Sequence, residues 1–480
     1  MSTIRLSSGR LWPLLALFIV VGCLISLPRP ASAQAPTITR LDGTLPDGTP
    51  WEIAVPSNWN GALLVDLDFT GSQARYAPLY ARGFAGAGIQ REEGAGDAQA
   101  NSARFVEVLD IFNANFGRPN RTIANGRSRG GVTAVVMMET YPERIDGALG
   151  QCTVPGYITS YNGKLDHAFA AQVLLGTDLA IVNIPADSAQ YNALTSAWSN
   201  LIIAAQATPQ GKARIALAHA LGQLPVWANP SQPRPDPAND DQMQQSMFNA
   251  LREQFLSRLG VRRTYEQASG GVFNWNTGVD YAEIFNEMVR PEVRAIVEEF
   301  YRRAGLDVKH DLHVINNAPR IAANPASVVD VQRRGGHTGN PSRPLLINQV
   351  IGDPTTQAVT MQSYVEEATK NGKGDLVREV FSDVAGHCNF STASYVAVVE
   401  ALDERVRTGV WPDTSPAAMN ARARTVVPTA VPVFVAYEAE EFARPFFLGD
   451  VYHMLGCADP ASPNAANGLN RGSPEGCRKP

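Results

Sequence analysis

A serine between glycines is the first candidate for chemistry in this chain. Residues 126–131 read Gly-Arg-Ser-Arg-Gly-Gly, so Ser128 stands two residues after one glycine and two residues before another. A nucleophilic serine on a sharp strand-to-helix turn needs small residues at these positions, because the backbone passes close to itself there. The helix that follows would direct free backbone N–H groups towards an oxyanion. Taken alone, the string also fits an ordinary solvated basic loop.

Catalysis by a serine hydroxyl requires a base. Two of the seven histidines lie outside residues 153–340, a region whose sequence pattern differs from that around Ser128. His387 lies in the sequence Gly-His-Cys, on a loop directly after a predicted strand. His453 lies in a cysteine-bearing tail, where we expect a structural or surface role. We therefore expect His387 to take the proton of Ser128; the alternative is a loop histidine with satisfied hydrogen bonds.

An acidic residue must orient that histidine, and for a serine on a strand-to-helix turn the chain order is serine, acid, histidine. Asp353 ends a predicted strand in Gly-Asp-Pro, where a loop carboxylate can point along the edge of a sheet. Asp375 and Asp383 are rivals, the first as a turn residue and the second just before the histidine loop. A plain Asp-Pro turn is the alternative reading of Asp353, which we nevertheless expect to be the acid.

Strands and helices alternate on both sides of these residues. Apolar runs bounded by turn residues predict strands, and apolar residues at helical spacing predict helices. The predicted strands are 37–45, 51–55, 62–67, 84–89, 121–124, 145–150, 345–351 and 377–382, and the predicted helices are 98–116, 131–140, 358–371 and 391–408. This alternation predicts an α/β fold with a mostly parallel sheet covered by helices on both faces.

The pattern changes between residues 153 and 340. Helix-like segments dominate there, for example 213–221, 242–259 and 281–303, with a proline-rich break at 230–237. We therefore expect one α/β core made of residues 34–152 and 341–450, interrupted by a helical lid or cap at 153–340. Residues 451–480 would form a C-terminal tail rich in proline, glycine and asparagine.

This layout resembles the α/β-hydrolase superfamily. The matching motifs are residues 126–131, Gly352-Asp353 and residues 386–388, and the resemblance covers roughly 62–152 and 344–408, with the insertion in the usual position of the lid. The resemblance implies an α/β-hydrolase fold, with Ser128 as the nucleophile, His387 as the general base and Asp353 as its orienting acid.

The resemblance also implies two backbone donors that stabilise an oxyanion. One is the N–H of Arg129, the residue after the nucleophile. The other comes from the loop after the third strand, where family members often have His-Gly. This chain has Asp-Phe-Thr-Gly at residues 68–71, so the second donor is expected to be Phe69 or Thr70.

Apart from Cys23 near the N-terminus, the chain has four cysteines: Cys152, Cys388, Cys457 and Cys477. An even count in an oxidising compartment predicts two disulfides, in one of three pairings. A local staple between Cys457 and Cys477 is the most economical choice and leaves Cys152 with Cys388. The His-Cys pair is also similar to the tannase and feruloyl esterase family, in which a disulfide ties the histidine loop to a cysteine just before the serine. Here Arg127 occupies that position, and Cys152, which ends the next strand, is the expected substitute.

Two arginines flank the serine. The ordinary interpretation is that Arg127 and Arg129 form salt bridges to surface carboxylates, above all Arg127. The functional alternative is that one of them contacts a carboxylate or an oxyanion of the substrate through its planar guanidinium.

The N-terminus predicts export. Arg5 and Arg10 precede an apolar run at residues 11–27, and Ala-Ser-Ala at residues 31–33 provides a cleavage site, so we expect a signal peptide that ends at Ala33. A membrane anchor is one alternative, although the run is short for a span. Lipoprotein processing at Cys23 is the other. The expected location is secreted or periplasmic.

Composition excludes several classes of function. The 480 residues are 44% hydrophobic and 18% charged with a net charge of −5, which provides no basic field for nucleic acid. No two cysteines have CxxC spacing, so we expect neither a metal site nor a cofactor. Aromatic residues of the insertion would be core, or would favour a bulky or aromatic substrate if they line the cleft: Trp198, Trp227, Phe273 and Trp275.

The sequence thus predicts a secreted serine hydrolase that cleaves a small-molecule carboxylic ester through an acyl-enzyme. A peptidase or amidase with the same triad is the alternative within the enzymes, because the triad serves both leaving groups. A non-catalytic binding protein of the same fold is the alternative from another class, and the unusual Asp-Phe at residues 68–69 is its best support.

Overall fold

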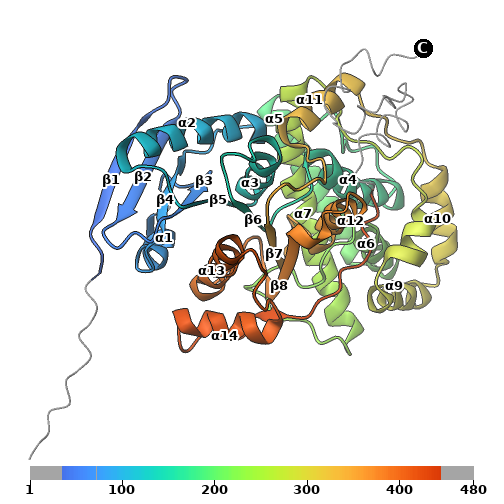
Figure 1. Cartoon of the computed structure of the whole chain (residues 1–480). Helices are drawn as coiled ribbons and strands as arrows, with labels where there is room; N and C mark the ends of the chain where they lie inside the picture. Colours follow the sequence, from blue (N-terminus) through green and yellow to red (C-terminus); the bar gives the residue numbers. More distant parts are fainter. Residues whose placement is uncertain (1–34, 72, 445–480) are drawn as a thin grey trace, which may run out of the picture. The chain divides into compact units, whose positions relative to one another are not determined.

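One sheet organises the chain. The structure is a computed structural model that describes residues 35–71 and 73–444, so the predicted signal peptide, His453, Cys457 and Cys477 lie outside the described residues. The strand order is β1-β2-β4-β3-β5-β6-β7-β8-β9 (Figure 1). The strands are β1 (Ile38–Thr44), β2 (Pro50–Pro56), β3 (Ala62–Asp66), β4 (Ala85–Ile89), β5 (Arg121–Arg127), β6 (Gly147–Gln151), β7 (Leu345–Gly352), β8 (Val377–Ala385) and β9 (Phe434–Val435).

The central strands are parallel, as the alternation of elements predicts. Strands β4, β3, β5, β6, β7 and β8 pair in parallel, whereas β1, β2 and β9 add antiparallel edges. The strand order reverses at β3. The next strand in sequence, β4, pairs with one side of β3, and the strand after that, β5, pairs with the other side. Ligands of open α/β sheets bind where the carboxyl ends of strands meet such a reversal. Ser128 follows β5 at this end of the sheet.

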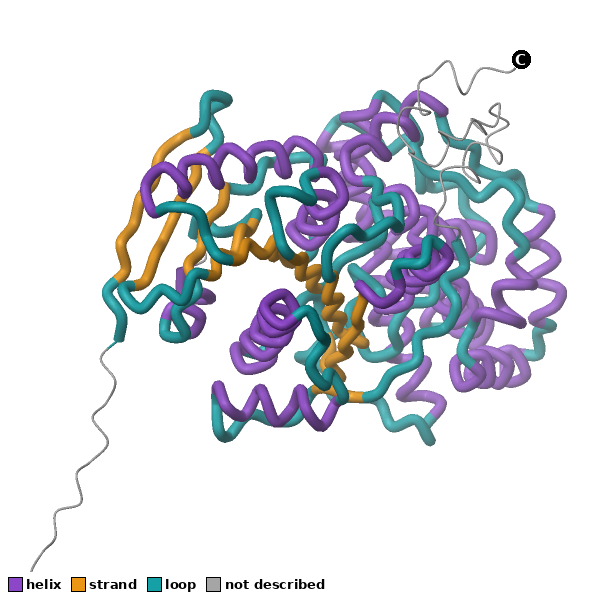
Figure 2. Tube along the Cα trace, viewed as in Figure 1, coloured by secondary structure: helices purple, strands orange, loops and turns teal. Residues whose placement is uncertain are grey.

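Helices cover both faces of the sheet (Figure 2). Side chains alternate between the faces along each strand, so that Leu63 and Val65 pack under α2, α3 and α12, and Leu64 packs against α1, α13 and α14. The fold is therefore the predicted α/β-hydrolase fold. The helices of this part are α1 (Gln73–Tyr80), α2 (Ala98–Phe116), α3 (Arg129–Thr140), η2 (Ala358–Met361), α12 (Gln362–Lys370), η3 (Gly374–Leu376), α13 (Thr392–Thr408) and α14 (Pro416–Val426).

The segment between β6 and β7 is helical and has a core of its own, which includes Trp198 and Phe255. A second cluster, with Tyr157 and Phe273, packs on Val132 of α3 and so joins this segment to the sheet region. None of the helices in residues 35–444 is both long enough and apolar enough to cross a bilayer. The segment contains α4 (Tyr157–Leu174), α5 (Ser188–Gln206), α6 (Pro209–Leu221), α7 (Asp240–Ser269), α8 (Tyr281–Glu283), η1 (Ile284–Met288), α9 (Pro291–Ala304), α10 (Val308–Asn317) and α11 (Pro325–Gly335).

One predicted helix is wrong in extent. Residues 281–303 do not form a single helix, because Arg290 takes an extended ψ of 136° before Pro291. A proline has no N–H to donate and disfavours helical angles in the residue before it, so the helix stops and α9 starts anew with the proline in its first turn. The segment 358–371 likewise begins with the short 3-10 helix η2 before α12.

Three buried histidines stay neutral at pH values well below the ordinary pKa of histidine. Burial lowers the pKa of His167 to about 3, of His219 to about 4 and of His337 to about 3. The unfolded chain takes up protons on these groups near pH 6.5, whereas the folded chain does not. Because the unfolded state then binds more protons, the free energy of unfolding falls as the pH drops from about 6.5 towards 4.

We expect this acid sensitivity to decrease in His337→Gln, since one of the three groups no longer titrates. The measurement is the urea midpoint of wild type and variant at about pH 7 and about pH 5. His310→Gln, at an exposed position on α10, is the control and should leave the decline unchanged. If the urea midpoint falls equally between about pH 7 and about pH 5 in wild type and His337→Gln, His337 does not contribute to the acid sensitivity.

Candidate active site

Ser128 occupies a strained turn between β5 and α3. Its φ of 56° and ψ of −120° lie in a region that residues with a side chain seldom adopt. Two backbone hydrogen bonds hold it there: its N–H donates to the Gln151 carbonyl at 2.9 Å, and its carbonyl accepts from the Val132 N–H at 3.1 Å. The serine hydroxyl is therefore presented at the carboxyl end of the sheet by a fixed backbone.

The flanking glycines explain why the turn needs its motif. A Cβ on Gly126 would lie 2.1 Å from the backbone carbon and oxygen of Gly130, and one on Gly131 would lie 2.8 Å from the Cβ of Thr153. Gly130 itself has ordinary room, since the nearest atom to a Cβ there is 3.4 Å away. The first glycine is thus a steric requirement of the turn, as predicted.

His387 and Asp353 are brought to Ser128 in a continuous chain of contacts. The Nε2 atom of His387 lies 2.9 Å from the Ser128 hydroxyl oxygen, and its Nδ1 atom lies 2.8 Å from Oδ2 of Asp353. The rivals lie elsewhere: Asp383 is ion-paired with Arg234, and Asp375 precedes the amino end of β8, the opposite end from the histidine loop. The geometry joins the three residues that the sequence singled out.

The Asp353 carboxylate is fully buried and richly hydrogen-bonded. It accepts from the backbone N–H groups of Thr355 at 2.8 Å, Thr356 at 3.0 Å and Cys388 at 3.1 Å, and from the Thr356 hydroxyl at 2.8 Å. Donors to a charged carboxylate stabilise its ionised form and fix its direction. The carboxylate also contacts Nδ1 of the His387 ring.

The predicted disulfide between Cys152 and Cys388 is confirmed. It joins the residue after β6 to the residue after His387, with the two Cα atoms 5.3 Å apart. Both cysteines have positive φ, as does Ser128, so three of the five described non-glycine residues with that backbone meet at this site. The sulfur, carboxylate and imidazole atoms lie within 4.8 Å of one another, but sulfur atoms bonded to each other provide no thiolate to a metal.

Arg127 departs from the expected salt bridge. Within residues 35–444 it pairs with no carboxylate; its guanidinium lies over the rings of Phe390 at 5.5 Å and Tyr395 at 4.7 Å. The end of β5 directs this side chain towards the face that α13 covers, and burial lowers the pKa of Arg127. Because Phe390 belongs to the histidine loop, the cation–π contact supports that loop in addition to the disulfide.

A row of polar side chains crosses the sheet beneath Ser128 and was not predicted. The Asn125 amide donates to Asp66 at 3.0 Å and to the hydroxyls of Tyr76 at 3.1 Å and Tyr395 at 3.0 Å, and Gln151 donates to the Asn125 carbonyl oxygen at 3.1 Å. In the sequence, this row corresponds to one polar residue near the carboxyl end of each of three strands: Asp66 in β3, Asn125 in β5 and Gln151 in β6. The same Gln151 holds the Ser128 N–H through its backbone, so this row stiffens the turn.

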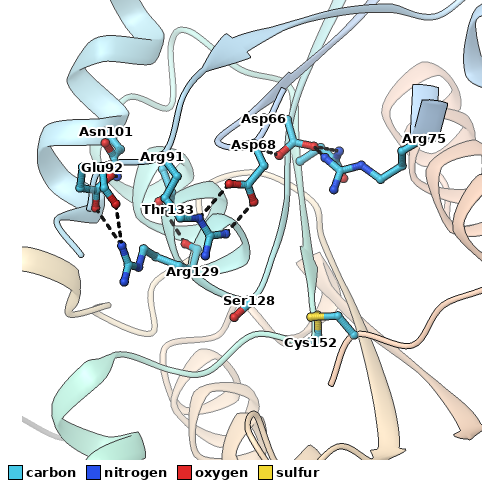
Figure 3. Close-up of polar contacts among 12 residues, drawn as sticks. Asp66, Asp68, Arg75, Arg91, Glu92, Asn101, Ser128, Arg129, Thr133 and Cys152 are labelled. Carbon is cyan, nitrogen blue, oxygen red and sulfur yellow. Dashed lines mark hydrogen bonds and ion pairs between the residues drawn. A yellow bond between two sulfur atoms is a disulfide. The ribbon is translucent and has the colours of Figure 1, made fainter. Parts of the chain in front are cut away.

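The loop after β3 is fixed beside the start of α3 (Figure 3). Arg91 donates to both carboxylate oxygens of Asp68, at 2.8 and 2.6 Å, and a Cβ on Gly130 would lie 3.4 Å from Leu67. The Phe69 ring is fully buried and lies edge-on to Tyr76. This loop therefore runs next to the turn that carries Ser128.

Arg129 makes the salt bridge expected of it. Its guanidinium lies 3.5 Å from a Glu92 carboxylate oxygen and donates to the backbone carbonyls of Glu92 at 3.2 Å and Gly94 at 3.0 Å (Figure 3). The Arg129 side chain thus holds the loop after β4. The backbone N–H of Arg129 lies at the start of α3.

The sheet, the strained serine and the order of its partners define the class: the chain is an α/β-hydrolase. Within this class it belongs to the family of the o-phthalyl amidase of Xanthobacter agilis, to which it is 34% identical over 423 residues, covering 82% of this chain and 92% of the relative. No protein-family model matches the chain. The relative is a hydrolase, and we conclude that this chain is one too.

Solved structures of similar fold include feruloyl esterase B of Aspergillus oryzae, with 16% identity, a TM-score of 0.35, and coverage of 78% of this chain and 82% of that one. An esterase of Pyrococcus furiosus is also similar, with 9% identity, a TM-score of 0.35, and coverage of 77% of this chain and 90% of that one.

Gly126→Ala should destabilise the protein by about 2–4 kcal/mol, because the new methyl group collides with backbone that cannot move without opening the turn. Gly130→Ala is the matched variant and should change stability by less than about 1 kcal/mol, since its methyl group meets only ordinary contacts. Urea unfolding of both variants measures the difference. Similar losses in both would contradict the steric account.

The double variant Cys152→Ala/Cys388→Ala should lose about 2–5 kcal/mol of stability, because the cross-link no longer restricts the unfolded chain. It should also lower kcat/KM about tenfold or more, since the histidine loop is held less accurately. Cys457→Ala/Cys477→Ala is the control and should leave kcat/KM unchanged. Urea unfolding and ester hydrolysis report the two effects; wild-type values of both would refute the positioning role.

Proposed function

We propose that this hydrolase cleaves amide and ester bonds of aromatic carboxylic acids through an acyl-enzyme, with Ser128, His387 and Asp353 as its catalytic triad. The observation that carries the proposal is the chain of contacts from the serine hydroxyl through the imidazole to the buried carboxylate. The sequence alone favours an ester substrate. Because the relative is an amidase, the proposal includes amides as well as esters.

The first half-reaction forms the acyl-enzyme. As the Ser128 oxygen bonds to the carbonyl carbon, its proton passes to Nε2 of His387. The carbonyl oxygen becomes an oxyanion that accepts hydrogen bonds from the N–H of Arg129 and from that of Phe69 or Thr70. His387 then donates its proton to the leaving nitrogen or oxygen, the bond to the leaving group breaks, and the carbonyl re-forms as a serine ester.

The second half-reaction releases the acid. Water gives a proton to His387 as its oxygen bonds to the acyl carbon, and the second tetrahedral intermediate collapses when Ser128 leaves with that proton. Asp353 accepts the hydrogen bond from the N–H of the histidine Nδ1 throughout and so orients the ring. The four donors around its carboxylate support this role.

Buried tyrosines of the helices between β6 and β7 pack beside the loop after β4. Tyr157 and Tyr265 lie with ring centroids 5.2 Å apart, and the Tyr265 hydroxyl accepts a 3.2 Å hydrogen bond from the N–H of Gly96, in the loop after β4. Helices between β6 and β7 would thus act as the lid that shapes the substrate pocket. Trp198, expected as core, is fully buried and takes no part.

We also propose that the protein is exported after removal of residues 1–33. The Cys152–Cys388 disulfide supports this location, because such bonds persist in oxidising compartments.

A fluorophosphonate probe should label the wild type and fail to label Ser128→Ala, because the probe bonds only to an activated serine. Ser188→Ala, at an exposed position on α5, should label as wild type does. His387→Ala should reduce labelling strongly by removing the base. Labelling is read on denaturing gels after circular dichroism has shown that each variant is folded.

Absence of labelling in folded wild type would favour the non-catalytic binding protein, and equal labelling of Ser128→Ala would show that another serine reacts. Hydrolysis of matched anilides and phenyl esters of benzoic acid then measures the balance between amidase and esterase activity.

A further inference from the structure

A cavity of about 260 Å³ lies where β7 and β8 end, between these strands and the helices α6, α7 and α9. Among the described residues that line it, none belongs to the chain of contacts at Ser128. An apolar cavity of about 150 Å³ can hold benzene, so this one has room for a bicyclic ring. Its walls are mostly apolar and include Leu224, Val226, Met243, Val293, Ile351 and Val359.

The charged side chains of the lining are already paired with one another. Arg234 donates to Asp383 at 2.9 Å, and Arg290 donates to Glu440 at 2.8 Å. Glu292 brings the charged groups of the lining to three carboxylates and two guanidinium groups, and the exposed side chains of Arg234 and Glu292 mark the mouth. A ligand with a carboxylate would find no free cation here, so the cavity favours an uncharged molecule.

One polar atom of the lining has no partner among the residues that the structure describes. Gln357 is 2% exposed, and its Nε2 donates to the carbonyls of Gly222 at 2.6 Å and Gln223 at 3.0 Å. The Oε1 atom of the same amide is buried and accepts from none of those residues. Because a buried oxygen without a hydrogen bond is unfavourable, a ligand that donates an N–H or O–H would complete this site.

The backbone beside the cavity is strained and firmly held. Gln223, which also lines the cavity, has a positive φ of 46°. Its Nε2 donates to the carbonyls of Met288 at 3.1 Å and Glu441 at 2.8 Å, and its Oε1 accepts from the N–H of Ala443 at 3.0 Å. Strained residues held by several contacts cluster at functional sites, and three of the other four described here lie at the serine. The cavity is therefore a preformed site.

The proline-rich segment 225–234, which forms one wall of the cavity, also supports both catalytic loops. A Cβ on Gly352 would lie 2.4 Å from the carbonyl oxygen of Trp227, and one on Gly386 would lie 3.0 Å from Cδ of Pro230. These two glycines directly precede the acid and the histidine. An occupant of the cavity would thus contact the segment that lies behind the acid and the histidine, without contacting either of them.

We propose that this cavity is a second ligand site, separate from Ser128, for a small uncharged apolar molecule that carries one hydrogen-bond donor. The apolar walls hold its ring, Oε1 of Gln357 accepts its donor, and the paired charges at the mouth disfavour carboxylates. The bound molecule restrains segment 225–234 and, through it, the loops of the acid and the histidine.

The binding test uses 1-naphthol as the probe, with affinity measured by isothermal titration. Wild type should bind 1-naphthol about tenfold more tightly than 1-methylnaphthalene, which has a similar shape and no donor. It should bind 1-naphthoate at least about tenfold more weakly than 1-naphthol, because the carboxylate finds no free cation. Absence of 1-naphthol binding would overturn the site. Equal affinity for 1-methylnaphthalene would overturn the role of Gln357, and equal or tighter binding of 1-naphthoate would overturn the charge argument.

Variants locate the bound probe. Val293→Phe fills the cavity from α9 and should abolish binding of 1-naphthol, and Val289→Phe replaces it if that variant does not fold. Val314→Phe, at an exposed position on α10, is the control and should bind as wild type does. Asp383→Asn should increase the affinity for 1-naphthoate, because Arg234 then loses its carboxylate partner. Binding of 1-naphthol that survives in both cavity-filling variants would overturn the site.

Hydrolysis of 4-nitrophenyl benzoate tests the restraint on the two loops. Saturating 1-naphthol should raise kcat about twofold or more and leave KM unchanged, since the bound molecule limits the movement of the acid and the histidine and does not contact the substrate. This increase should be absent in Val293→Phe. An unchanged kcat, or a higher KM alone, would overturn the restraint. The titrations do not depend on the proposed function: if 1-naphthol binds as expected and the ester is not cleaved, the site stands and the proposed function fails.

Discussion

The near-contact of the backbone at Gly126 with that at Gly130 is the constraint on which the rest of the site depends. A chain that leaves a strand and enters a helix within two residues has no room for a side chain at Gly126, and Ser128 takes a positive φ in this turn. The strain is held by the backbone hydrogen bond to Gln151, whose side chain is itself anchored in the polar row across the sheet. The serine is thus fixed by the sheet rather than by its own loop.

The histidine loop, in contrast, is not part of the sheet and has to be attached to it. The disulfide to Cys152 fixes the loop to the strand beside Ser128, and the stacking of Arg127 on Phe390 supports it further. Both attachments start from residues next to the serine turn, so His387 and Ser128 are positioned by the same part of the structure. An arginine at position 127 is compatible with this arrangement because the cross-link comes from the neighbouring strand.

Local signals in the sequence predict the serine turn, the acid and the base, because each sits in a short motif at the end of a predicted strand and the order along the chain removes most rivals. The even number of cysteines and their spacing also predict the disulfide. What the sequence does not predict depends on packing between distant segments. The stacking of Arg127 and the hydrogen bonds of Asn125 require knowledge of which face α13 covers. The break before Pro291 differs from the predicted continuous helix, because the apolar spacing continues across the proline.

The insertion leaves the sheet after β6 and returns at β7, and these two strands are direct neighbours in which Gln151 pairs with Asn348. Its two ends are therefore adjacent, and the hydrogen-bonded ladder closes beneath it whatever its length or sequence. Exchange of the inserted helices would therefore leave the register of the strands, and the turn at Ser128 that depends on it, unchanged. In evolutionary terms, the inserted helices and the sheet can vary as two separable parts of one chain.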